Sequence, residues 1–125
     1  MLSLRRVKKW MTPNRKGRQN NLVLQSLFRR IMLRKMKDEI ELLSRHIEVA
    51  KAVADHEPIG IMKLAELLNL PSHRIRYSLH VLEQFGYIRA SAEGALATSR
   101  TAELFEHLNG DLDDLIRLLS EMRRP

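Results

Sequence analysis

The stretch LPSHRIRYSLHVLEQFGYI, residues 70–88, decides the fold of this chain. Within it Ile75, Leu79 and Leu82 recur at spacings of four and three residues, which places them on one face of a helix. A helix with this pattern is expected to bury that face against a core. Gly86 follows the last turn, where glycine commonly lets a chain leave a helix.

The opposite side of this predicted helix carries polar and cationic side chains, and Ser72 is a suitable N-cap for its first turn. Arginine can bond a guanine edge in bidentate fashion, while serine and histidine can reach phosphates or bases. In helix-turn-helix proteins the N-terminal half of the second helix enters the major groove. The candidate DNA contacts on this helix are Ser72, His73, Arg74, Arg76, Tyr77 and His80.

The neighbouring segments predict the remaining parts of a winged helix-turn-helix. Leu64, Leu67 and Leu68 fall on one face of a short helix, and short apolar runs after Gly86 favour a hairpin. The expected elements are a strand stub at 59–61, a short helix at 62–70, a turn at 69–71, the helix from Ser72 to about Gly86, and strands at 87–90 and 95–98 around a loop at 91–94.

The segment PIGIMKLAELLNLPSHRIRYSLHVLEQFGYI resembles the core of prokaryotic winged-helix regulators of the broad ArsR/MarR kind, especially small archaeal ones. The resemblance rests on LAELLNLPSHRIRYSL, where a short helix, a turn and a recognition helix follow at the usual lengths. It also rests on LHVLEQFGYI, which is similar to the L-x-x-L-x-x-x-G-hydrophobic-hydrophobic exit of that superfamily. It covers about residues 45–98 and is specific for the fold more than for one family. It implies a dimeric, sequence-specific DNA-binding regulator that uses the six residues above.

The expected wing differs from this pattern. Its tip is Ala-Glu-Gly, and Arg89 and Arg100 flank it, of which we count Arg89 among the candidate DNA contacts. The chain has no cysteine to match the metal-thiolate sensors of the ArsR kind. We find no metal-ligand spacing and no catalytic constellation, so we expect no metal, no cofactor and no enzymatic activity.

The first 37 residues carry twelve Lys and Arg and no acid, whereas the rest carries ten basic and fifteen acidic residues. Pro13, Asn14 and Gly17 interrupt any long helix in residues 1–20, which we predict to be a flexible basic arm. Whether this arm contacts phosphates or is simply a solvated terminus stays open. Its candidate DNA contacts are Arg5, Arg6, Lys8, Lys9, Arg15, Lys16 and Arg18.

Residues 21–57 contain neither proline nor glycine, so helix is expected throughout. Ser44 is a potential N-cap, and we expect it to divide this region into helices at 21–43 and 45–56. An apolar seam from Leu33 to Ala50 repeats at three and four residues, and it either packs on the chain's own core or pairs two copies. Its candidate dimer contacts are Met36, Ile40 and Leu43.

Two further helices are expected after the hairpin, one at 99–108 and one starting after Asp111, with Gly110 between them. The last has acidic residues in its first turn and arginines at its end, the order that a helix dipole favours. Its apolar face either completes the core or joins two subunits, as terminal helices commonly do in the superfamily. The candidate dimer contacts here are Leu112, Leu115, Ile116, Leu119 and Met122.

The composition sets the remaining bounds. A chain of 125 residues with 44% apolar and 5% aromatic content suits one domain plus an extension, with a core mainly of Leu, Ile, Val and Ala. The lack of cysteine fits a reducing compartment. No apolar run approaches the roughly 18–20 residues that span a bilayer, and no secretory leader pattern is present, so we expect a cytoplasmic protein.

The expected organisation is a flexible basic arm at 1–20, an N-terminal helix at 21–43, a winged helix-turn-helix domain at 44–98 and C-terminal helices at 99–125. We expect a mostly α fold with a small β-hairpin wing. We expect it to act as a homodimer on double-stranded DNA, to regulate transcription and to take no small-molecule substrate.

Two rival hypotheses remain. A winged-helix protein-interaction module within a larger complex is favoured if acidic side chains surround Arg74 and Arg76. The acidic side chains concerned are Glu66, Glu83 and Glu93. Alternatively, the basic N-terminal segment binds a membrane surface or RNA, since an amphipathic basic helix suits anionic lipid and a basic arm does not distinguish nucleic acids.

Overall fold

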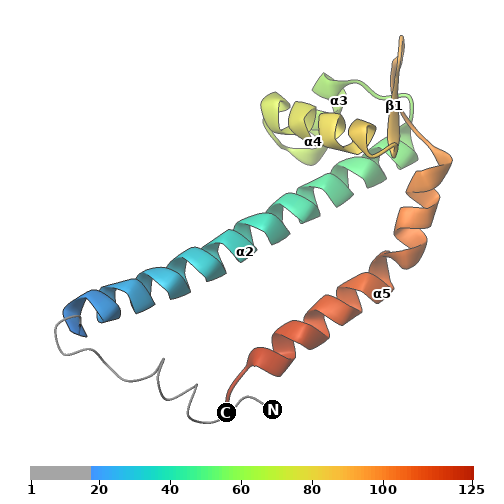
Figure 1. The fold of residues 1–125 in the computed structure, drawn as a ribbon. Coiled ribbons are helices and arrows are strands. Elements are labelled where there is room, and N and C mark those ends of the chain that lie inside the picture. Colours follow the sequence, from blue (N-terminus) through green and yellow to red (C-terminus); the bar gives the residue numbers. More distant parts are fainter. Residues whose placement is uncertain (1–17) are drawn as a thin grey trace. The chain divides into compact units, whose positions relative to one another are not determined.

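The computed structural model describes residues 18–125 (Figure 1). This part is mostly helical and holds one two-stranded antiparallel hairpin, as the sequence predicted. It forms two compact units, one ending at Glu41 and one running from Leu42 to Pro125. The elements in chain order are α2 (Arg18–His56), α3 (Ile61–Leu68), α4 (Ser72–Gln84), β1 (Ile88–Ser91), β2 (Gly94–Ala97) and α5 (Ser99–Met122).

Helix α2 runs without a break through Ser44, so the expected division into two helices is wrong. A serine caps a helix only where the chain before it is not helical, and here each added residue extends an existing helix at little cost. The helix also begins at Arg18, which corrects the boundary of the expected arm at residue 20. Residues 1–17 of that arm lie outside the described part.

Within the first unit, the described part of α2 exposes apolar side chains on several sides. Lys37 and Glu41 form an exposed ion pair of 3.8 Å one turn apart. The exposed large apolar side chains are Leu22, Val23, Leu24, Leu27, Phe28, Ile31, Met32, Leu33, Met36 and Ile40. None of these ten is buried by the unit itself.

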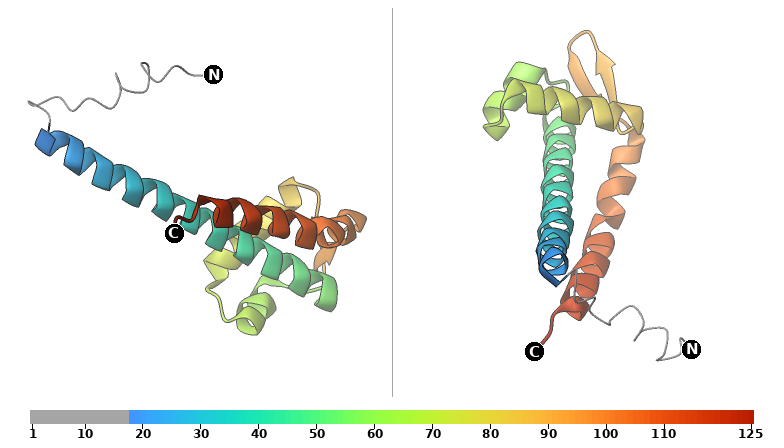
Figure 2. Two further views of the ribbon diagram at one scale, coloured as in Figure 1. Left: turned by 90° about the horizontal axis from the view of Figure 1, so that it is seen from below. Right: turned by 60° about the vertical axis from the view of Figure 1, so that its left-hand side comes forward.

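The second unit has a small core, to which nearly every element contributes. The last turns of α2 supply four buried side chains, and α4 lies across them (Figure 2). Fully burying one Val, Leu or Ile contributes about 1.5–3 kcal/mol, so this cluster is the main stabilising contact of the unit. Its members are Val49, Ala50, Ala52, Val53, Ile59, Leu64, Ile75, Leu82, Ile88 and Ala95.

The turn between α3 and α4 is set by two residues. Asn69 ends α3 in the left-handed region, with φ 53°, which asparagine tolerates better than most residues. Pro71 is the N-cap of α4, so Ser72 is the first helical residue and makes no capping hydrogen bond, contrary to the sequence prediction. Of the three leucines expected on one face of α3, Leu64 is fully buried while Leu67 is 50% exposed.

The hairpin is confirmed, with each boundary moved by one residue. Ile88 pairs with Ala97 and Ser91 with Gly94, which leaves a two-residue turn at its tip. Ile59 forms a bridge with Ala95, as expected for a strand stub. Gly94 has φ +135°, and a Cβ there would lie only 2.6–2.8 Å from the backbone of Ile59. Glycine is therefore required where the stub approaches the hairpin.

Threonine hydroxyls join the hairpin to α5. Thr101 is buried and donates to the carbonyl of Tyr87 at 2.7 Å, while Thr98 donates to that of Gly86 at 2.6 Å. Helix α5 then runs to Met122 through Gly110, so the expected break between two C-terminal helices is wrong. One glycine costs a helix about 1 kcal/mol, which the turns on both sides offset.

None of the helices within residues 18–125 combines the length and apolar character needed to cross a lipid bilayer.

Candidate nucleic-acid interface

Helix α4 has one buried face and one exposed face. Ile75, Ser78 and Leu82 are buried, while His73 and His80 are exposed on the opposite side. Since successive residues of a helix turn by about 100°, these two histidines lie almost directly above one another. The exposed face therefore presents two imidazole groups about two helical turns apart, with Arg76 beside them.

The two arginines of α4 do not share a face, which corrects the single polar side expected from the sequence. Arg74 and Arg76 are both exposed, but two helical steps turn them about 160° apart. Arg74 lies one turn before Tyr77 and Ser78, on the flank toward α2. Arg76 lies on the flank toward the hairpin, so only one of the two arginines joins the histidine face.

The flank toward α2 is fixed by the hydroxyl of Ser78, which is fully buried. Arg45 Nε donates to Ser78 Oγ at 3.2 Å, and His46 Nδ1 lies 2.9 Å from the same oxygen. An arginine can only donate, so the serine oxygen accepts from it and its own proton is free for His46. This arrangement suits a neutral imidazole whose proton is on Nε2.

The surroundings of His46 also favour its neutral form. Burial, and secondarily the neighbouring Arg45 guanidinium, lowers the pKa of His46 from its ordinary value of 6.5. The ring of Tyr77 lies 5.9 Å from that of His46, and Arg45 Cζ lies 5.9 Å from the centre of the Tyr77 ring. Tyr77 is 50% exposed, so it packs on α2 with one side and faces solvent with the other.

The sequence prediction did not identify Ser78, Arg45 and His46 as a cluster. A signal was present, because Ser78 occupies the apolar stripe of α4 between Ile75 and Leu82. A polar group at a buried helical position needs a hydrogen-bond partner. Its partners are more than thirty residues away in the sequence, so only the fold could name them.

The hairpin offers few cations. Arg89 is exposed on β1, opposite Leu96. Arg100, which the sequence placed beside the wing tip, instead lies against Gly86, because its side chain is 3.6 Å from the position of a Cβ there. The turn itself holds Ala92 and Glu93, so no basic side chain stands at the tip.

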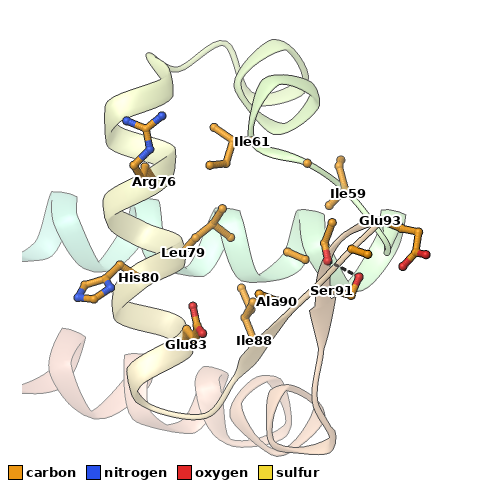
Figure 3. Close-up of a pocket in the computed structure, with 14 residues that line it drawn as sticks. Ile59, Ile61, Arg76, Leu79, His80, Glu83, Ile88, Ala90, Ser91 and Glu93 are labelled. Atoms are coloured by element: carbon orange, nitrogen blue, oxygen red, sulfur yellow. Dashed lines mark hydrogen bonds between the residues drawn. The ribbon is translucent and has the colours of Figure 1, made fainter.

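A pocket of about 530 Å³ lies between α4 and the hairpin (Figure 3). Arg76, His80 and Glu83 line it from α4, and Glu93 lines it from the hairpin turn. Of the three acidic residues named in the rival hypothesis, Glu83 and Glu93 line the same pocket as Arg76, while Glu66 lines a separate pocket beside α3. The lining of this pocket therefore carries charges of both signs.

The predicted contacts of the basic arm lie outside the described residues, apart from Arg18. Arg5, Arg6, Lys8, Lys9, Arg15 and Lys16 lie outside the described residues, and Arg18 is described only as the first residue of α2.

All the predicted dimer contacts are exposed in the single chain. Ile116 is 60% exposed on α5, and Met36 is 51% exposed on α2. Exposed apolar side chains at helical spacing are compatible with pairing of two copies. The same holds for Leu112, Leu115, Leu119, Met122, Ile40 and Leu43.

Comparison with known proteins gives a likeness of fold. No protein-family model matches the sequence, and a search of curated proteins finds no match. Among solved structures, the chain is similar to the X-ray crystal structure of the YusO protein from Bacillus subtilis, with a TM-score of 0.50 and 17% sequence identity. The alignment covers 98% of this chain and 88% of that chain. At this level of identity the likeness concerns the fold alone.

Proposed function

We propose that this chain is a winged helix-turn-helix transcriptional regulator that binds duplex DNA in a sequence-specific manner. In this proposal α3 and α4 are the helix-turn-helix, α4 is the recognition helix and the hairpin is the wing. The observation that carries the proposal is the exposed face of α4, where His73, Arg76 and His80 stand together. Arg76 takes part in none of the ion pairs found within residues 18–125.

The proposal assigns different tasks to different parts of the chain. Arg76 would contact base edges, as arginine commonly does with guanine, and Arg74 would contact a phosphate from the other flank. The basic residues of the first 37 positions would add salt-dependent attraction to the phosphate backbone. Such a regulator, of the prokaryotic ArsR/MarR-like kind, would act in the cytoplasm.

Two copies are part of the proposal because one recognition helix reads too few base pairs for high specificity. A dimer places two such helices about 34 Å apart, one turn of B-DNA. The exposed apolar faces of α5 and of the first part of α2 are the surfaces available for pairing. They differ in charge, since residues 18–37 contain six basic and no acidic residues, whereas α5 contains two basic and six acidic residues.

The test is an anisotropy titration of genomic duplex fragments over a series of salt concentrations. Arg76→Ala is expected to cost about 1–3 kcal/mol on preferred fragments and to reduce the preference among fragments. Replacing Arg5, Arg6, Lys8 and Lys9 by glutamine is expected to weaken binding to all fragments and lower the salt slope. The proposal is wrong if Arg76→Ala binds every fragment like the parent chain.

A protein-interaction module is the second candidate function. It is supported by Glu83 and Glu93, which line the same pocket as Arg76 and whose negative charges would repel phosphates. The same titration separates the two hypotheses. If neither the parent chain nor the Arg76→Ala variant binds duplex DNA at physiological salt, the protein-interaction module is favoured.

A further inference from the structure

The pocket between α4 and the hairpin has an apolar floor formed from three segments that are distant in the sequence. Ile59 and Ile61 come from the strand stub and the start of α3, Leu79 from α4, and Ile88 from β1. Figure 3 shows the Leu79 side chain pointing from α4 toward the hairpin. The volume of this pocket, about 530 Å³, is within the range of small-molecule binding sites.

Two charged groups of opposite sign stand along the α4 wall of this pocket. Arg76 and Glu83 are seven residues apart on one flank, which corresponds to about 10 Å along the helix axis. In Figure 3 the carboxylate of Glu83 lies between α4 and Ile88, whereas His80 points away from the hairpin. Within residues 18–125, Glu83 forms no ion pair, so its charge is free for a ligand.

The position of the charges favours a cationic ligand. The carboxylate of Glu83 stands beside the apolar floor, whereas Arg76 lies about two turns away on α4 and the side chain of Glu93 projects from the hairpin turn away from α4 (Figure 3). An ammonium group in the pocket would be attracted by Glu83 and repelled by Arg76. These two interactions would orient the ligand along α4 with its ammonium group at the Glu83 end. A carboxylate ligand would have to place its charge at the Arg76 end and its body near Glu83.

We infer that this pocket is a binding site for an organic monocation, an amine with an apolar body that lies on Leu79, Ile61 and Ile88 while its ammonium group bonds Glu83. The site requires only the fold of the second unit, so the inference does not depend on the proposed DNA binding, although the two sites share Arg76. Because Arg76 belongs both to the pocket and to the exposed face of α4, a bound amine would change the charge beside that face.

The test uses three probes with the same apolar body and different charge, namely 4-phenylbutylamine, 4-phenylbutan-1-ol and 5-phenylpentanoate. Binding to the full chain is followed by two-dimensional amide NMR and by calorimetry. The amine is expected to bind roughly tenfold more tightly than the alcohol, in keeping with a hydrogen bond to a charged group, and more tightly still than the carboxylate. Amide shifts should be largest in residues 76–83 and 88–95.

Matched variants assign the preference to particular groups. Glu83→Gln should abolish the preference for the amine, and Arg76→Gln should strengthen it. Glu66→Gln, which removes a carboxylate outside this pocket, should leave it unchanged. Ala90 is exposed and lines the pocket. Ala90→Leu should weaken the binding of all three probes, because the larger side chain fills the pocket while the core side chains are unchanged.

The inference is overturned if the carboxylate binds as tightly as the amine, or if no probe binds to saturation. It is also overturned if Glu83→Gln retains the full preference for the amine. Circular dichroism of each variant establishes that it is folded before its binding is compared.

Discussion

Replacing Ser78 by alanine tests the polar contact that holds α4 on α2. The change removes the acceptor of the Arg45 bond at 3.2 Å and the partner of His46 at 2.9 Å, at a position with no exposed surface. A hydrogen bond to a charged group contributes about 1.5–3 kcal/mol and a neutral one about 0.5–1.5 kcal/mol. Both partners are only half-buried, so water replaces part of this loss.

Alanine also relieves a cost, because burying a hydroxyl costs about 1–3 kcal/mol before it is hydrogen-bonded. The two effects partly cancel, and we expect Ser78→Ala to lower the free energy of unfolding by about 1 kcal/mol. The measurement is urea unfolding of the full chain, followed by far-UV circular dichroism at pH 7.5. Ser44→Ala, at an exposed position of the same α2, is the matched control and should change stability by under about 0.5 kcal/mol.

A double-mutant cycle separates the hydrogen bond from other effects of the substitution. Arg45→Met keeps an apolar side chain of similar length but removes the donor, together with the guanidinium beside Tyr77. If the bond is as described, the losses for Ser78→Ala and Arg45→Met will be less than additive by about 0.5–1.5 kcal/mol. Additive losses would refute the proposed contact, and a Ser78→Ala chain as stable as the parent would contradict the expected loss of about 1 kcal/mol.

Three further predictions concern other parts of the chain. The pKa of His46 is lowered from 6.5 in the folded chain, so the unfolded chain takes up the proton first and the free energy of unfolding falls as the pH drops below about 6.5. His46→Gln should flatten this slope in urea titrations between pH 5 and 8, whereas His107→Gln should retain it. Gly94→Ala should cost about 2–4 kcal/mol because its Cβ would meet the Ile59 backbone, while Gly60→Ala, where nothing lies within 4 Å, should change thermal unfolding by under about 1 kcal/mol. Leu115→Glu should convert a dimer to a monomer in light scattering, and a parent chain that is already monomeric would contradict the dimer proposal.

Local sequence patterns were sufficient to predict α4 and the hairpin. The spacing of Ile75, Leu79 and Leu82 predicted α4, since a helix repeats every 3.6 residues whatever it packs against. Gly86 was predicted at the exit from that helix, and its φ of +82° explains why glycine stands there. The hairpin was predicted to within one residue at each boundary.

Weak local signals gave the wrong helix boundaries. Ser44, Gly110 and Ser72 were each expected to start or end a helix, and the structure continues through the first two and places the cap of α4 at Pro71. A cap or a single glycine changes the free energy of a helix by about 1 kcal/mol. The helical turns on either side stabilise the helix by more than this amount. A single capping residue or glycine in the middle of a long helical segment therefore does not predict where the helix ends.

The sequence by itself determined that the chain is mainly helical, that α4 has one apolar and one polar side, and that a hairpin follows, because these features depend on neighbours within a few residues. Only the tertiary structure decided which polar residues of α4 face α2 and which face the hairpin. It assigned Ser78 to Arg45 and His46 of α2, and it brought Arg76 and Glu83 to the same pocket as Glu93 of the hairpin. These groups meet because the shared apolar core fixes α2, α4 and the hairpin around it, and the residues that form that core are distant in the sequence.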